Sequence, residues 1–332
     1  MTRLKNKVKQ KYIILCGILL LGFLAYVVQL THAGLWYDEA IEYFYSKVIY
    51  GVVPGGFGHV NMYERICSTY QPPLYNILMY FWLSIFDSEF GFRMAGVIIT
   101  LIGAIGIFKG LEELTQDIKY SSLGTLLYIF TYSVGYYALE CAEYNLMLCF
   151  LSWTAYFYIR IINRMDVPSL VGFFMCACLS VYSQYGAAFV VIGMFVSIAV
   201  HIIKNRNWKL LQRTIFITGI VLIVFVIPLI IFFLLPQMNK QGSVDVSHHP
   251  VFIYNIAIDF IISFVNSLRF FLGGSGVLDL GLLICLIGGG YGWILYRYCY
   301  CKEREGNLSA SYYNSGVLDM LFYRSGVFFL WI

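Results

Sequence analysis

Two adjacent carboxylates, Asp38 and Glu39, lie in the segment Leu35-Trp36-Tyr37-Asp38-Glu39-Ala40-Ile41. The segment follows an apolar run over residues 12–30 that is long enough to cross a bilayer. A carboxylate where a membrane helix leaves the lipid is costly to keep unless it has a function. A carboxylate can act as a general base that takes a proton from a hydroxyl. We therefore predict an active site at the membrane surface that acts on a lipid-borne substrate.

A structural interpretation of the same residues stays open. Acidic residues are favoured at helix N-termini by the helix dipole, so Asp38 and Glu39 can simply begin a helix over residues 38–50. Glu42, one turn after Asp38, is interpreted as a solvated or packing residue.

The composition is that of a membrane protein. Of 332 residues, 60% are hydrophobic and 12% charged, whereas soluble proteins carry about a quarter charged residues. The fold class we predict is all-α, a polytopic integral membrane protein with about nine transmembrane helices. The net charge of +4 is small, and we expect no nucleic-acid partner. The nine cysteines lack metal-site spacing, and a disulfide between the loop residues Cys67 and Cys141 is left open.

Basic residues predict the topology. The N-terminus is predicted to be cytoplasmic, because basic residues from Arg3 to Lys11 precede the first apolar run. The loops at 160–164, 204–213 and 297–304 are also basic, so we expect them on the cytoplasmic side too. Asp38 then lies outside the cytoplasm. The expected spans cover residues 12–31, 92–108, 121–138, 144–160, 169–183, 186–203, 214–235, 278–297 and 317–332.

Two apolar segments do not fit as spans. Residues 72–86 are too few to cross, and a crossing would invert the charge bias of every later loop. Residues 257–272 carry a polar stripe from Asp259 to Ser267 on an otherwise apolar helix. We expect both to be interfacial helices on the outer face.

With this topology, the polar residues at the membrane ends gather on the outer face. Such convergence is typical of a functional site. The residues are Asp38, Glu39, Glu42, Gln71, Arg93, Glu140, Glu143 and Gln184.

Five segments in this order resemble motifs of the GT-C glycosyltransferases, which include the protein O-mannosyltransferases and the bacterial lipid-linked sugar transferases. Leu35 to Ala40 resembles the Asp-Glu motif of the first loop, and Tyr70 to Tyr75 resembles a His-Pro-Pro-Leu-Tyr element. Ser88 to Met94 resembles an Arg-Leu-Pro-Ser segment, Tyr137 to Leu146 a Glu-Ala-Arg-x-Tyr-x-Leu motif, and Ser183 to Gly186 a His-Tyr-Tyr-Gly turn.

The resemblance implies one GT-C-like module over residues 1–332, strongest over 30–235. Members transfer a sugar from a polyprenyl-phosphate donor to an acceptor outside the cytoplasm, here a cell-envelope glycan, lipid or protein at the cell membrane. It implies that Asp38 is the base and Glu39 a second catalytic residue. Donor phosphate and substrate would be bound by Arg93, Gln71, Glu140, Tyr144 and Gln184. Because the chain ends in an apolar run and members are usually longer, we expect an incomplete C-terminal part.

The motifs also depart from the family pattern. Gln71 and Gln184 stand where the family has His, and Ala142 stands where it has Arg. Glutamine ligates metals poorly, so no cofactor is certain, although a divalent metal stays open; His248-His249 is a further metal candidate.

Two alternative functions remain. A lipid-linked polysaccharide polymerase or ligase would also use a polyprenyl donor, but should have more arginines in its outer loops. A non-catalytic transporter should show inverted repeats and broken helices near the midplane, and none is found in the sequence.

Overall fold

The computed structural model describes residues 2–30, 34–35, 37–47, 50–51, 60–67 and 71–241, and the structural statements below concern these residues. They belong to the first of two compact units, Met1–Ile256. The spans expected at 278–297 and 317–332, the amphipathic helix at 257–272 and His248-His249 lie outside the described residues.

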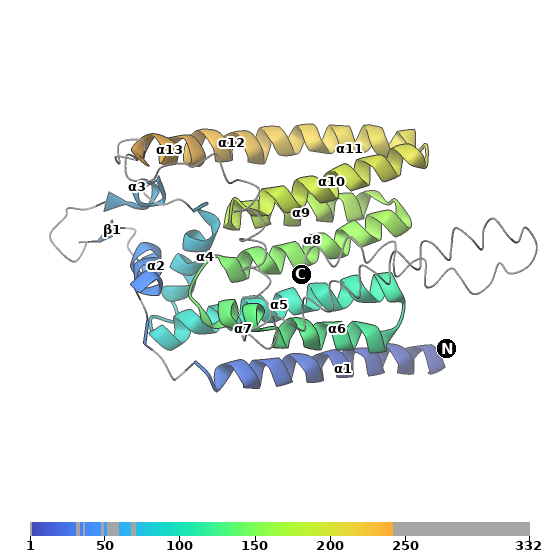
Figure 1. The fold of residues 1–332 in the computed structure, drawn as a ribbon, viewed down its shortest axis with the longest axis horizontal. Helices are drawn as coiled ribbons and strands as arrows, with labels where there is room; N and C mark the ends of the chain where they lie inside the picture. The colour runs from blue at the N-terminus through green and yellow to red at the C-terminus, as the bar shows by residue number, and fades with distance from the viewer. Residues whose placement is uncertain are drawn as a thin grey trace, which may run out of the picture. The chain divides into compact units, whose positions relative to one another are not determined.

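The described chain is mainly helical (Figure 1). Its helices are α1 (Thr2–Val27), α2 (Tyr37–Lys47), α3 (Met62–Cys67), α4 (Leu74–Leu83), α5 (Glu89–Thr115), α6 (Ile118–Phe130), α7 (Tyr132–Leu139), α8 (Tyr144–Arg164), α9 (Val167–Ser183), α10 (Ala187–Lys204), α11 (Trp208–Val221), α12 (Ile227–Leu229) and α13 (Leu235–Gln241), with π-helical stretches at Leu222–Val226 and Ile230–Leu234. The strands β1 (Tyr50–Gly51) and β2 (Val60–Asn61) pair antiparallel, with Tyr50 opposite Asn61.

Five helices in the described part are long and apolar enough to cross a membrane. They are Gln10–Val27, Glu89–Thr115, Tyr144–Arg164, Ala187–Lys204 and the composite helix Trp208–Asn239. The predicted fold class, an all-α polytopic membrane protein, is therefore confirmed. The α9 helix, Val167–Ser183, is apolar but shorter.

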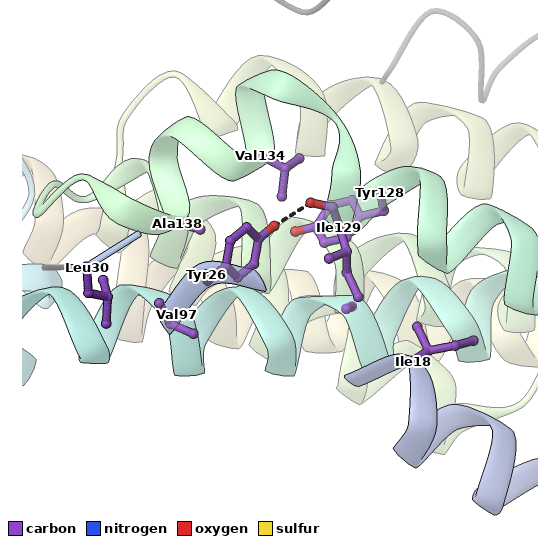
Figure 2. Packing of buried hydrophobic residues seen from close by; sticks show 9 residues of the cluster. Ile18, Tyr26, Leu30, Val97, Tyr128, Ile129, Val134 and Ala138 are labelled. Carbon is purple, nitrogen blue, oxygen red and sulfur yellow. Dashed lines mark hydrogen bonds between the residues drawn. The ribbon is translucent and has the colours of Figure 1, made fainter. Parts of the chain in front are cut away.

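The continuous span expected over residues 121–138 is wrong. The chain leaves the helical conformation at Thr131, where ψ is 134°, and two helices result, α6 and α7. The Thr131 hydroxyl donates to Leu127 O at 2.6 Å, so it satisfies one of the carbonyls in the last turn of α6. The break leaves helix-end carbonyls without helical partners, and Tyr26 of α1 donates its hydroxyl to one of them, Ile129 O (Figure 2).

Helix α5 is central to this packing. One of its faces meets α1, α6 and α7 in an apolar cluster that contains Val97, Ala104 and Ile129. Another face meets α8 through glycines: a Cβ atom at Gly103 would lie 3.0 Å from Cys149 Cα, and one at Gly106 would lie 3.1 Å from Ser152 C. Small residues that allow close backbone approach are the usual means of holding membrane helices together.

The α4 helix agrees in length with an interfacial position. Its ten residues rise about 15 Å, half of a hydrocarbon core of about 30 Å. Tyr75, Asn76, Met79 and Leu83 are buried, while Phe81 is 63% exposed. The helix therefore has one face against the protein and an apolar face outward.

The composite helix Trp208–Asn239 deviates from α-helical geometry on both sides of Pro228. Proline has no N–H to donate within the helix, and π-helical stretches lie on both sides of it. Tyr182 donates to Phe225 O at 2.7 Å, and Tyr63 donates to Phe232 O at 2.9 Å. Side-chain donors of this kind satisfy carbonyls of irregular membrane helices.

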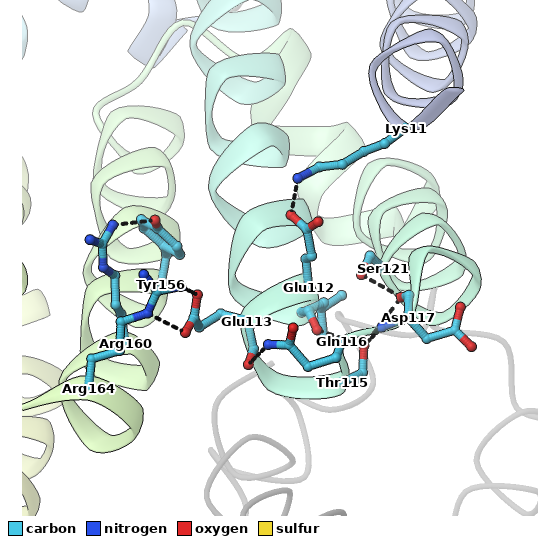
Figure 3. A network of polar contacts seen from close by, with 11 residues as sticks. Lys11, Glu112, Glu113, Thr115, Gln116, Asp117, Ser121, Tyr156, Arg160 and Arg164 are labelled. Carbon is cyan, nitrogen blue, oxygen red and sulfur yellow. Dashed lines mark hydrogen bonds and ion pairs between the residues drawn. The ribbon is translucent and has the colours of Figure 1, made fainter. Parts of the chain in front are cut away.

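Ion pairs join α1, α5 and α8 (Figure 3), at the end of the long helices opposite α2 (Figure 1). Glu112 of α5 pairs with Lys11 of α1, and Glu113 accepts two hydrogen bonds from Arg164 of α8, at 2.9 and 2.7 Å. This end also carries the basic turn between α10 and α11 (Figure 1).

Candidate active site

The site lies where α2, α4, the start of α5 and the connection from α7 to α8 meet, at one end of the long helices (Figure 1). Five carboxylates from these elements form what we call the carboxylate cluster: Asp38, Glu39, Glu42, Glu140 and Glu143. The interpretation of Asp38 and Glu39 as helix-starting residues is confirmed, since both lie in the first turn of α2. They nevertheless differ, because Asp38 is exposed whereas Glu39 is 2% exposed.

Glu39 forms a buried ion pair with Arg93. Arg93 Nη2 donates to Glu39 Oε2 at 2.6 Å, and the backbone N–H of Cys141 donates to Glu39 Oε1 at 3.0 Å. Both carboxylate oxygens are therefore engaged, one by α5 and one by the segment after α7. Glu39 connects three parts of the site.

The Arg93 side chain is also engaged by backbone carbonyls. Nη1 donates to Leu139 O at 2.7 Å and Nη2 to Gly34 O at 3.1 Å. Nε lies 3.8 Å from the Glu89 carboxylate. With 8% of its surface exposed, Arg93 is held between the first loop and the end of α7, and not extended towards solvent.

Glu42 is buried, as the packing alternative predicts and the solvated alternative does not. It is 7% exposed and accepts a hydrogen bond from Asn76 Nδ2 of α4 at 2.8 Å. Burial, with Glu143 and Asp38 nearby, raises its pKa to about 8, against the lowering effect of hydrogen bonds from Asn76 and Gln71. Glu42 therefore carries a proton at neutral pH.

Glu140 and Glu143 complete the cluster from the α7–α8 connection. Burial raises the pKa of each to about 7; the charges of Glu39 and Asp38 add to the effect at Glu140, and that of Glu140 adds at Glu143. Beside them, the Tyr144 ring lies 4.8 Å from that of Tyr137, measured between centroids. The predicted site residues Glu140 and Tyr144 are thus brought to the same region as Asp38.

The two glutamines differ in position. Gln71 reaches the cluster, since its side chain hydrogen-bonds to Glu42. Gln184 ends α9, and its side-chain oxygen accepts a hydrogen bond from the Gly186 N–H within the α9–α10 turn. The contact described for Gln184 is therefore local to that turn.

Two residues of this region were not identified from the sequence. Asn76 was counted within an apolar interfacial segment, although a lone amide among apolar residues is a signal for a buried polar partner. Gln237 lies just beyond the span expected over residues 214–235, yet it is 2% exposed and donates a hydrogen bond to the backbone carbonyl of Gln71.

No group of three or more His, Cys, Asp or Glu in the described ranges is arranged to hold a metal ion. Cys67 and Cys141 are free thiols, so the disulfide left open from the sequence does not form.

Residues 70–232 match the family model of dolichyl-phosphate-mannose-protein mannosyltransferase. Neither a curated protein nor a solved structure matches the chain significantly. The matched region begins before the Gln71-Pro72-Pro73 element and includes Arg93, Glu140, Tyr144 and Gln184. Over these residues the chain is similar to the dolichyl-phosphate-mannose-protein mannosyltransferase family, a match consistent with a membrane glycosyltransferase of the GT-C type.

Proposed function

We propose that this protein transfers a sugar from a polyprenyl-phosphate donor to a hydroxyl of a cell-envelope acceptor outside the cytoplasm, with Asp38 as the general base. The observation that carries the assignment is the difference within the carboxylate cluster. Of its five members, Asp38 alone is exposed. A general base must reach the proton that it removes.

The other carboxylates are engaged by partners, or burial raises their pKa. Glu39 is paired with Arg93, and Glu42 is bound to Asn76. Burial favours the protonated form of Glu140 and Glu143. We therefore propose that Glu39, expected as a second catalytic residue, positions its neighbour Asp38 through the ion pair.

The proposed step balances as a substitution at the anomeric carbon of the donor sugar. Asp38 takes the proton of the acceptor hydroxyl as that oxygen bonds to the anomeric carbon, and the bond from this carbon to the phosphate oxygen breaks. The products are the glycosylated acceptor, polyprenyl phosphate and protonated Asp38, which returns its proton to water.

For Arg93, the geometry supports an organising role more than direct binding of the donor phosphate, because its guanidinium is occupied by Glu39 and two carbonyls. Removal of Arg93 would then disturb Asp38 and the α7–α8 connection together. Gln71, Glu140, Tyr144 and Gln184 remain proposed substrate contacts.

The test is incubation of membranes containing the protein with radiolabelled polyprenyl-phosphate sugars, following label into lipid, glycan and protein fractions. Transfer that depends on Asp38 supports the proposal, and the labelled fraction identifies the acceptor class. Label that extends existing polymers by whole repeat units would favour a polymerase or ligase. Movement of the intact donor across the membrane without transfer would favour a transporter.

A further inference from the structure

A buried amide, Gln237 of α13, joins three segments that are far apart in the sequence. Its Nε2 donates both hydrogens, to Ile66 O and to Gln71 O, each at 2.8 Å. Its Oε1 accepts a hydrogen bond from the Tyr185 hydroxyl at 2.9 Å. With 2% of its surface exposed, the amide satisfies both of its donors and one acceptor site inside the protein.

The geometry of the composite helix sets the direction of this side chain. A π turn holds one residue more than an α turn, and two π stretches precede α13, at Leu222–Val226 and Ile230–Leu234. Residues beyond them are therefore rotated from the positions that a continuous α-helix would give. Tyr63 of α3, bound to Phe232 O, keeps the helix against the first loop just before Gln237.

The contacts of Gln237 lead to the carboxylate cluster. The backbone of Gln71 is held by Gln237, and the side chain of Gln71 hydrogen-bonds to Glu42. Glu42 follows Asp38 by one turn of α2, and residues four apart share a helix face. Glu42 is also bound to Asn76, three residues beyond the two prolines.

We infer that Gln237 is a positioning residue for the transferase: it holds the backbone carbonyls of Ile66 and Gln71 near Tyr185 and so sets the Gln71 side chain against Glu42, one helical turn after Asp38. Its kinetic consequence rests on the proposed function, while its structural consequence can be measured without any substrate. Gln237 lies beyond the family match, which ends at residue 232.

The test uses the full chain in lipid nanodiscs. Gln237→Met removes both donors at similar length, and Gln212→Met, at an exposed position of the same composite helix, is the matched control. Hydrogen–deuterium exchange is followed in peptides over residues 60–76. Loss of two net hydrogen bonds predicts about tenfold faster exchange there in Gln237→Met and no change in Gln212→Met. The same variant should lose about tenfold in kcat with little change in KM for the donor.

A second variant separates hydrogen bonding from packing. In Gln237→Glu, the protonated carboxyl can donate one hydrogen bond to a carbonyl, whereas the carboxylate can donate none. After correction for intrinsic exchange rates, its protection over residues 60–76 should be nearer to wild type at pH 5.5 than at pH 8. Gln237→Met should lack this recovery. Tyr185→Phe removes one hydrogen bond only, so exchange over residues 60–76 should rise less than in Gln237→Met. It also provides a test if Gln237→Met fails to fold.

Wild-type protection and kcat in both Gln237→Met and Gln237→Glu would overturn the inference, as would equal loosening in Gln212→Met. If the wild-type protein transferred no sugar from any donor, the proposed function would fail, but the exchange measurements would still decide the positioning role.

Discussion

The Arg93 guanidinium lies 2.6 Å from the Glu39 carboxylate, and the side chains of both residues are buried. The pair joins the first turn of α2 to the start of α5, the helix against which α1, α6, α7 and α8 pack. Asp38, the neighbour of Glu39, is thereby tied to the most constrained helix of the described bundle.

If Asp38 is the base, Asp38→Asn should keep the shape of the site and lower the transfer rate by about 10²–10⁴-fold. Glu39→Gln should be milder, since it still accepts from the Cys141 N–H. Initial rates with a labelled polyprenyl-phosphate sugar measure both. Asp87→Asn, an Asp-to-Asn change at an exposed residue paired with Lys47, is the control. A folded Asp38→Asn protein with the wild-type rate would exclude the assignment.

Removing one member of the buried ion pair should cost more than removing both. Arg93→Met leaves the Glu39 charge buried and should destabilise the protein by about 3–5 kcal/mol. The double variant Arg93→Met, Glu39→Leu should recover much of this loss without recovering transfer. Unfolding midpoints in detergent for the wild type, both single variants and the double variant give the coupling energy. Purely additive effects would mean that the pair does not act as a unit.

Stability should fall as the pH rises from about 5 to about 8. The pKa of Glu42 is raised from 4.5 to about 8, and those of Glu140 and Glu143 to about 7. In this window the folded protein keeps protons that the unfolded chain releases, so ionisation favours unfolding. Above about pH 8 the curve should level off. Thermal unfolding across this range measures the slope, and Glu42→Gln should flatten it; an unchanged slope in that variant would contradict the assignment.

The α5–α8 contact should tolerate no side chain at Gly103. A Cβ atom there would lie 3.0 Å from Cys149 Cα, so Gly103→Ala should destabilise the protein by about 1–3 kcal/mol. Gly17 of α1 has no atom within 4 Å of the same added Cβ, and Gly17→Ala should be neutral or stabilising by up to about 1 kcal/mol. Denaturation in detergent compares the pair, and equal effects would argue against close helix contact.

The orientation can be tested by thiol labelling in a background without native cysteines. A cysteine at Gly56 should react with an impermeant reagent in intact cells, and one at Asn205 should react only after the cells are opened, because basic residues surround Asn205. Labelling of Asn205 but not Gly56 in intact cells would reverse the topology and place Asp38 in the cytoplasm.

The sequence predicts the helical membrane fold because long apolar runs and basic loops are local signals. It also brings Asp38, Arg93 and Glu140 to one face, since that follows from helix order alone. It does not predict that the Arg93 guanidinium donates its hydrogen bonds to Glu39 and to Leu139 O. Such pairing depends on how α5 packs against α2 and α7. The sequence does not predict the break at Thr131 for a similar reason: Tyr26 of α1 binds the Ile129 carbonyl at the end of α6, and that contact depends on how α1 packs against α6. Gln237 depends on two π turns that no periodicity reveals.

The composite helix from Trp208 to Asn239 combines a largely exposed apolar surface with a few polar contacts to other parts of the protein. Only 6% of its most apolar window is buried, whereas its carbonyls at Phe225 and Phe232 and the amide of Gln237 are bound by side chains and backbone of other helices. At its exposed positions, therefore, the side chain must be hydrophobic, but which hydrophobic residue it is should matter little. A deep mutational scan should tolerate exchanges among Leu, Ile, Val and Phe on that exposed surface, and should show intolerance at Gln237 and at the buried positions Leu210, Thr214 and Leu229.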